Sequence, residues 1–205
     1  VGNSNSLGFL ALLAIANTPL AAQERASDSR TREIEALLAH PPFAGTYVCS
    51  EHAAGQLPAV GDDLGVDCLT VDVDFSVRGA LAFPRLYSGD GARNEDWHSW
   101  NQDVFAPIDG VVMALRVNPV VNVPGSTGTP PASFVLLRRD DGVFVVIAHL
   151  QDIVVQQGDT ITAGMKIARV GNNGFGRMPH VHIGAWRGRD ALQLRWDQRR
   201  MQVGR

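Results

Sequence analysis

The sequence lacks the features that direct a protein to nucleic acids or into a membrane. Its 205 residues carry a formal net charge of only −3, and Lys166 is its single lysine. A general nucleic-acid-binding protein would carry a marked basic excess instead. No apolar run reaches the roughly 20 residues that a transmembrane helix needs. We therefore expect no nucleic-acid partner and no membrane span in the mature chain.

The main apolar run, Leu7–Ala16, lies near the N-terminus and is too short to cross a bilayer. It fits the hydrophobic region of a signal peptide covering residues 1–22, with cleavage near Ala22. The basic residues that usually precede such a region are absent before Leu7, and a buried N-terminal helix is the alternative. A signal peptide predicts a periplasmic or secreted protein.

Cysteine is scarce, with only Cys49 and Cys68 present. In an oxidising compartment an isolated pair predicts a disulfide, which would stabilise the fold by about 3 kcal/mol. Two separate buried thiols are the alternative. No CxxC pair is present, so a cysteine-ligated zinc site is not expected. His52 lies within the segment between the cysteines and is expected to face solvent.

Short strands separated by turns dominate the chain from Asp103 onward. Residues 103–117 indicate two strands with a turn at Pro107–Gly110, and residues 133–150 indicate a hairpin that turns at Asp141-Gly142. Further short strands follow through residues 152–171, 180–188 and 192–199. This pattern predicts an all-β fold, an antiparallel sandwich or barrel.

Two segments precede the predicted β core, and one long loop interrupts it. A short helix is predicted over residues 27–39, within a helix and linker segment 23–43. Residues 44–85 would form a β extension that holds the cysteine loop, and residues 86–205 the β core. The loop 118–133, rich in proline, glycine and small residues, is expected to be an exposed flap.

The sequence "PHVHIGAW" places His180 and His182 two residues apart in a predicted strand, so both side chains point to one face. Such a pair can bind one metal ion, or one ring can bind it while the other acts on metal-bound water. Alone, the pattern is more often a pair of strand histidines. Here a glycine-rich loop precedes it, His149 ends an apolar strand, and His98 stands between two aspartates.

Three segments together resemble a known family. "DVFAPIDGVVMAL", "VVIAHLQDIVVQQGDTITAGMKIARVGNNG" and "PHVHIGAW" are similar to the lysostaphin-type (LytM-like) zinc metallopeptidases, and the resemblance covers about residues 86–187. It implies a duplicated-hybrid-motif β fold, a Zn²⁺ cofactor and peptidoglycan peptides as substrate. Most members are cell-wall endopeptidases that cut peptidoglycan cross-links.

The resemblance also implies residue roles. His182 corresponds to a metal ligand, His180 to a catalytic histidine beside the metal-bound water, and His149 to its partner. Zinc would polarise the scissile carbonyl and lower the pKa of bound water towards about 7. A neutral imidazole can then take the proton, and an imidazolium can stabilise the oxyanion.

The family's second ligand pair, a His-x-x-x-Asp motif, is less well matched. Asp103, followed by a strand and a proline, resembles the aspartate, but Ser99 stands where the histidine should be. His98 is one residue too early and would need a bulge to share a strand face with Asp103. We predict His98 and Asp103 as ligands, with Asp96 as the reserve carboxylate.

The sequence thus predicts an exported zinc metalloendopeptidase. The first alternative is a metal-poor, non-catalytic relative that binds or regulates other cell-wall enzymes, which the stretched ligand motif favours. A lipoyl-type carrier module is the second, but Lys166 lies within a predicted strand and not at a hairpin tip.

Overall fold

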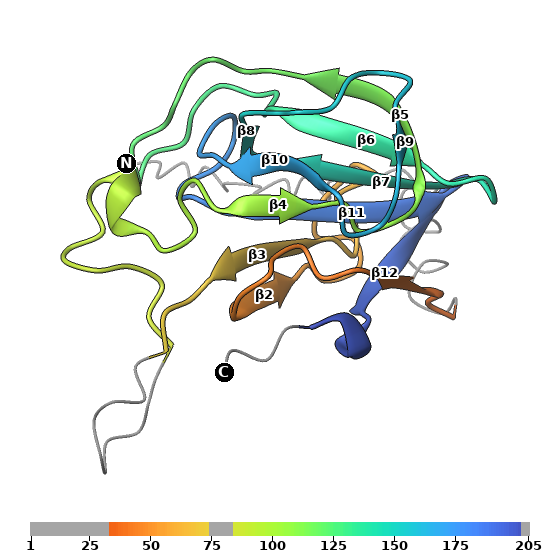
Figure 1. Ribbon diagram of the computed structural model, residues 1–205, viewed down its shortest axis with the longest axis horizontal. Helices are drawn as coiled ribbons and strands as arrows, with labels where there is room; N and C mark the ends of the chain where they lie inside the picture. Colours follow the sequence, from red (N-terminus) through yellow and green to blue (C-terminus); the bar gives the residue numbers. More distant parts are fainter. Residues whose placement is uncertain (1–32, 74–83, 202–205) are drawn as a thin grey trace, which may run out of the picture. The chain divides into compact units, whose positions relative to one another are not determined.

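The structure is a computed structural model that describes residues 33–73 and 84–201 (Figure 1). The predicted signal peptide and the first part of the predicted helix, residues 27–32, lie outside the described residues. Among the described residues, no helix is long and apolar enough to cross a membrane.

Most strands join one nine-stranded sheet, whose main path runs β1-β12-β11-β7-β6-β5-β9, while β3 pairs with β11 and β2 with β3. A three-stranded sheet has the order β4-β10-β8. The strands of the large sheet are β1 Ala36–Ala39, β2 Tyr47–Glu51, β3 Val66–Thr70, β5 Gly110–Arg116, β6 Phe134–Arg138, β7 Val143–Ala148, β9 Thr160–Ile161, β11 Val181–Arg187 and β12 Asp190–Trp196. The small sheet holds β4 Asp103–Phe105, β8 Leu150–Gln151 and β10 Lys166–Val170. In the described part of the chain, two 3-10 helices, η1 Asn94–Asp96 and η2 Gln198–Arg200, lie outside the sheets.

The core lies between the two sheets, and Figure 1 shows β4 and β10 in front of β7 and β11. Alternate residues of β7 are buried, as expected for a strand with one face on a core. Its buried Val145 and Ile147 belong to one apolar cluster with Val104 of β4 and Ile167 of β10. The predicted all-β, mainly antiparallel fold is confirmed, including the turn at Asp141-Gly142 between β6 and β7.

The predicted N-terminal helix is wrong over its last residues, because Ala36–Ala39 is strand β1 and pairs in parallel with β12. Leu37 is 3% exposed and Leu38 is 56% exposed, so neighbouring residues point to opposite sides. A helix would have placed both leucines near one face. Backbone pairing with the edge of β12 overrides the local helical pattern.

The predicted disulfide is confirmed. Cys49 and Cys68 stand opposite each other in the antiparallel pair β2–β3 and are bonded to each other. Cys68 is fully buried in the core. The bond therefore ties together two neighbouring strands, one of which, β3, also pairs with β11.

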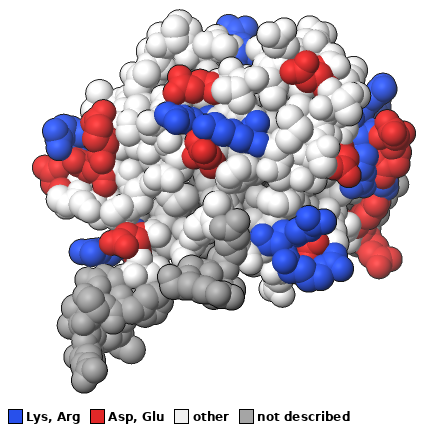
Figure 2. Space-filling model, in the orientation of Figure 1, with Lys and Arg blue, Asp and Glu red and all other residues white. Residues whose placement is uncertain are grey.

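Charge is mixed on the face shown in Figure 2, where basic and acidic side chains lie interspersed and do not gather by sign. Asp103, for example, lies 2.6 Å from Lys166 and 3.3 Å from Arg169 on the small sheet. This distribution agrees with the modest net charge of the sequence.

Candidate metal centre and active site

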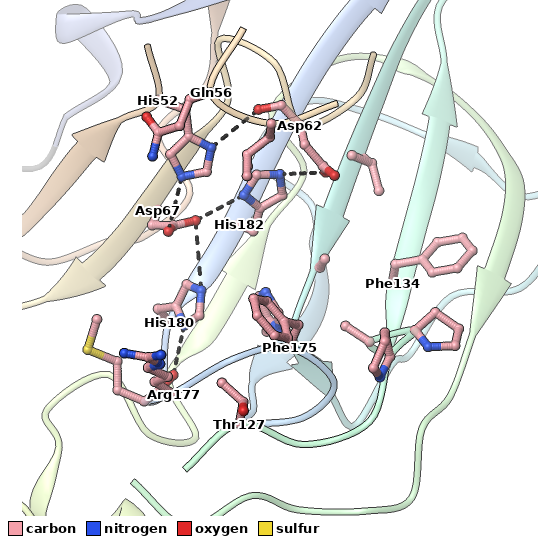
Figure 3. A pocket seen from close by; sticks show the side chains of 18 residues that line it. His52, Gln56, Asp62, Asp67, Thr127, Phe134, Phe175, Arg177, His180 and His182 are labelled. Carbon is pink, nitrogen blue, oxygen red and sulfur yellow. Dashed lines mark hydrogen bonds and ion pairs between the residues drawn. The ribbon is translucent and has the colours of Figure 1, made fainter. Parts of the chain in front are cut away.

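The predicted histidines meet at a cavity of about 560 Å³, whose residues are drawn in Figure 3. His149, His180 and His182 all line it, together with three residues from the β2–β3 hairpin and its connection, His52, Asp62 and Asp67. The cavity falls in the size range of ligand sites in proteins. Sequence elements far apart in the chain therefore converge on one polar centre.

Strand register places Asp67 beside His182. In the antiparallel pair β3–β11, Asp67 stands directly opposite His182, so the two side chains lie on the same face of the sheet. The His182 Nδ1 atom is 2.9 Å from Asp67 Oδ1, and His182 is only 6% exposed. Its other nitrogen, Nε2, is 3.1 Å from Asp62 Oδ1.

His52 completes this group from the end of β2. Its backbone N–H donates to Gly65 O at 2.8 Å, which extends the β2–β3 ladder by one residue. Its Nε2 atom is 3.2 Å from Asp67 Oδ2, and its ring stacks on that of His182 with centroids 5.2 Å apart. The prediction that His52 faces solvent is wrong, because its side chain is only 10% exposed.

The donor set of His52, Asp67 and His182 fits a zinc ion. One ligand atom from each residue lies within 4.8 Å of the other two. Both ring nitrogens of His182 lie near carboxylate oxygens, which only accept, so without a metal the ring carries two protons when it pairs with both. The contact of Nε2 with Asp62 is an ion pair without hydrogen-bond geometry. A cation between Nδ1 and Asp67 could replace one of the two protons. Tetrahedral ligands about 2.0 Å from zinc lie about 3.3 Å apart. His182 Nδ1 and His52 Nε2 approach the Asp67 carboxylate to 2.9 and 3.2 Å.

His149 and His180 are held in a different state. His149 Nδ1 is 2.8 Å from the carbonyl oxygen of Asn173, and His180 Nδ1 is 2.7 Å from that of Met178. A carbonyl only accepts, so both Nδ1 atoms carry the proton and both Nε2 atoms are free to act as bases. The two rings are neighbours, with centroids 4.3 Å apart.

The pKa values separate the two kinds of histidine. Burial, helped by the charge of His180, lowers the pKa of His149 to about 3, and burial also lowers that of His180. Burial acts in the same direction on His182, but contacts with Asp62 and Asp67 outweigh it and raise its pKa to about 9. The pKa of Asp67 is lowered although burial opposes this, because His182 and His180 lie beside it.

Glycines allow the chain to approach β11 closely at this centre. A Cβ atom on Gly184 would collide with the carbonyl group of Gly61, and one on Gly65 would lie 2.9 Å from Cε1 of His182. The segment that carries Asp62 therefore packs directly on the strand face that holds His182. Only residues without a side chain at these two positions permit that contact.

The structure places His98 and Asp103 elsewhere. Asp103 lies on β4, pairs with Lys166 and Arg169, and faces a separate hollow beside Phe43 and Thr70. The His98 backbone N–H donates to the carbonyl oxygen of Leu86, and His98 does not line the histidine cavity. The prediction that His98 and Asp103 join His182 is therefore corrected. The structure brings His52 and Asp67 to His182 instead. The reserve residue Asp96 bonds to Arg93 instead.

The sequence contains a pattern that could have identified Asp67 as a site residue. Asp63 and Asp67 have the spacing of the family's His-x-x-x-Asp motif, with an aspartate in place of the histidine. The Asp63 side chain accepts a hydrogen bond from the Gly55 N–H at 2.8 Å and does not line the cavity. No local pattern points to His52, which reaches the site only through the β2–β3 pairing.

Residues 97–194 match the sequence profile described as "Peptidase family M23". This segment belongs to peptidase family M23. It holds His149, His180 and His182, whereas His52 and Asp67 precede it. A comparison with curated proteins finds no match.

Several solved structures resemble the chain at low identity. The catalytic domain of the antimicrobial peptidase lysostaphin from Staphylococcus simulans is 16% identical over 78% of this chain and 84% of its own, with a TM-score of 0.38. A chain of the SpoIIQ-SpoIIIAH pore forming complex is 24% identical over 45% of this chain and 53% of its own, with a TM-score of 0.37. Csd3 of Helicobacter pylori is 16% identical over 82% of this chain and 34% of its own, with a TM-score of 0.46. The match thus spans about half of the SpoIIQ-SpoIIIAH chain and a third of the Csd3 chain.

Proposed function

We propose that the protein is an exported zinc-dependent endopeptidase that acts on peptidoglycan peptides. Membership of a peptidase family supports hydrolysis of a peptide bond. The observation that carries the proposal is the pairing of a zinc-type donor set, His52, Asp67 and His182, with two neutral histidines on one cavity. The disulfide supports an oxidising compartment, since such bonds are rare in the cytosol.

In this proposal the chain itself holds the metal through His52, Asp67 and His182. Three protein ligands are the number that catalytic zinc sites use, which leaves one position open. When bound, zinc would supply a Lewis acid that polarises a carbonyl group and acidifies water. Asp62 holds the outer side of His182, as carboxylates commonly do for zinc-binding histidines.

The two neutral histidines have different roles in the proposed reaction. His180 Nε2 is 3.8 Å from Asp67 Oδ1, so its free nitrogen faces the ligand group. It takes a proton from the attacking water and delivers it to the leaving amine. His149 stands one ring further away, at 6.4 Å from the His182 ring, and its free Nε2 accepts a hydrogen bond from the water or from the substrate.

The rest of the cavity suits an extended peptide. Many of the other lining residues are apolar and come from the loop 118–133 and the adjoining strands, namely Pro130, Pro131, Ala132, Phe134, Val146 and Ala148. The predicted flap thus contributes to the wall of the cavity. An apolar wall beside a few convergent polar groups is the usual composition of a ligand site.

Zinc content is the direct test of this proposal. We expect about one zinc per chain in the full-length protein after dialysis, as a single catalytic site requires. Asp67→Asn and His52→Ala should lose it, whereas the control variants Asp103→Asn and His98→Ala should keep it. Release of peptides from peptidoglycan by the parent protein completes the test. Zinc binding that survives Asp67→Asn would overturn the proposed ligand set.

A non-catalytic, partner-binding role is the second candidate, and one observation favours it. Asp63 replaces the histidine of the family's ligand motif. If His52 does not restore metal binding, the chain would act through contacts with other cell-wall enzymes. A parent protein that holds no zinc after reloading, and that releases no peptides, would select this candidate.

A further inference from the structure

The cavity contains one cationic side chain that the proposed mechanism does not use. Arg177 lines the cavity, three residues before His180, and its side chain is exposed. Figure 3 shows it among the labelled residues on the His180 side of the site. The other charged residues of the cavity, Asp62 and Asp67, are paired with histidines.

The main chain that carries Arg177 is fixed by the loop 118–133. The Asn122 side-chain amide donates to the carbonyl oxygens of Gly174 and Gly176 at 2.9 and 2.8 Å. The Gly125 N–H donates to the Arg177 carbonyl oxygen at 2.8 Å. Asn122 is itself only 6% exposed, so this support is well packed. The base of the Arg177 side chain is therefore held in place beside the cavity.

The guanidinium, by contrast, has no ion pair or side-chain hydrogen bond with any residue in the described ranges 33–73 and 84–201. Other arginines form ion pairs with neighbouring carboxylates. Arg139 and Arg187, for example, both pair with Asp141. A guanidinium is always charged at physiological pH, and its planar fork matches a carboxylate through two parallel hydrogen bonds. A cation that is fixed at its base, unpaired at its tip and aimed at a substrate cavity is suited to an anionic ligand.

We propose that Arg177 binds a carboxylate of the substrate peptide and thereby selects peptides that carry one next to the cleaved bond. This inference rests on the proposed function for the identity of the substrate. The cavity of about 560 Å³ can hold only a few residues, so the carboxylate lies within about two residues of that bond. It can belong to the C-terminus or to a residue within the peptide, and both sources present the same group.

Binding of three synthetic tetrapeptides distinguishes the two sources. They are L-Ala-γ-D-Glu-L-Lys-D-Ala, its C-terminal amide, and the form in which the α-carboxylate of the γ-linked glutamate is an amide. Calorimetry uses the full-length, zinc-supplemented chain with His149→Asn, which prevents turnover. We expect one of the amides to bind about ten- to a hundredfold more weakly than the parent peptide, as loss of a charge-assisted contact predicts.

Variants at Arg177 then connect this preference to the side chain. Arg177→Gln should abolish the difference between acid and amide, Arg177→Lys should keep part of it, and the exposed control Arg116→Gln should leave it unchanged. The proposal is overturned if neither amide binds more weakly, if none of the peptides binds, or if Arg177→Gln keeps the discrimination. Discrimination by the variant, without any release of peptides from peptidoglycan by the chain with His149 intact, would instead refute the peptidase activity and leave the role of Arg177 standing.

Discussion

His182 and Asp67 face each other across β11 and β3, with Nδ1 of the ring 2.9 Å from Oδ1 of the carboxylate. The pair is fixed by backbone register and not by the loops around it. Any change that keeps the two strands aligned should therefore preserve this half of the proposed ligand set.

Asp62→Asn tests the group that holds the outer nitrogen of His182. Asp62 Oδ1 lies 3.1 Å from Nε2, and the amide is isosteric but uncharged. We expect zinc affinity to fall about 10- to 100-fold, as is typical when the outer partner of a ligand is changed. Competition with a chelator measures this, and Asp63→Asn is the matched control. Equal affinities for the two variants would remove Asp62 from the site.

His180→Ala and His149→Ala should separate chemistry from metal binding. Each ring is fixed through Nδ1 to a backbone carbonyl and does not belong to the donor set. We expect both variants to retain zinc and to lose about 100-fold or more in kcat, in line with removal of a general base. Peptide release and zinc content measured on the same samples provide the test. A variant that loses zinc together with activity would place its ring among the ligands.

The stability of the metal-free protein should fall in acid because of His149. Its pKa is about 3 in the folded protein and about 6.5 when unperturbed, so between these values the unfolded chain binds a proton that the folded chain does not. The free energy of unfolding therefore decreases as the pH falls from about 6.5 towards 3. His182 acts at the other end, because its pKa is raised to about 9 and its stabilising contribution is lost as the pH rises from 6.5 through 9.

Urea unfolding at a series of pH values measures this effect. His149→Asn should reduce the slope on the acid side without removing it, since the pKa of His180 is lowered as well. The slope above pH 6.5 should remain as in the parent protein. An unchanged acid slope in His149→Asn would contradict the buried, neutral state of this ring.

Gly184→Ala should displace the segment that carries Asp62. A Cβ atom at this position would collide with the carbonyl group of Gly61, and neither group is a flexible side chain. We expect a loss of about 1–3 kcal/mol of stability, as for other steric insertions in packed regions, together with weaker zinc binding. Gly45→Ala is the control, because nothing lies within 4 Å of its Cβ position. A fully stable Gly184→Ala protein with parental zinc affinity would contradict the close contact.

The three histidines His149, His180 and His182 could be predicted from the sequence. Alternation along a strand is enough to place His180 and His182 on one face, and His149 was conspicuous as a polar end to an apolar strand. The short strands and turns likewise predicted the all-β fold. These inferences depend only on local periodicity, which a single sequence displays directly.

The rest of the site depends on pairing between strands, which the sequence does not display. His52 and Asp67 are 15 residues apart and approach each other because β2 and β3 pair, and they approach His182 because β3 pairs with β11. Asp103 begins strand β4, as predicted, but β4 pairs with β10. The Asp103 carboxylate forms ion pairs with Lys166 and Arg169 of that strand. Motif spacing alone favoured Asp103, which the structure does not bring to His182.

The Cys49–Cys68 bond joins the two strands whose ends carry His52 and Asp67. Cys68 directly follows Asp67 in the chain, and Cys49 lies three residues before His52. A newly made chain with both thiols reduced would lack the clamp that aligns two of its three proposed ligands. On the proposed function, oxidation would act as the final assembly step of the site, and the proposed wall-cutting activity would mature only in an oxidising compartment.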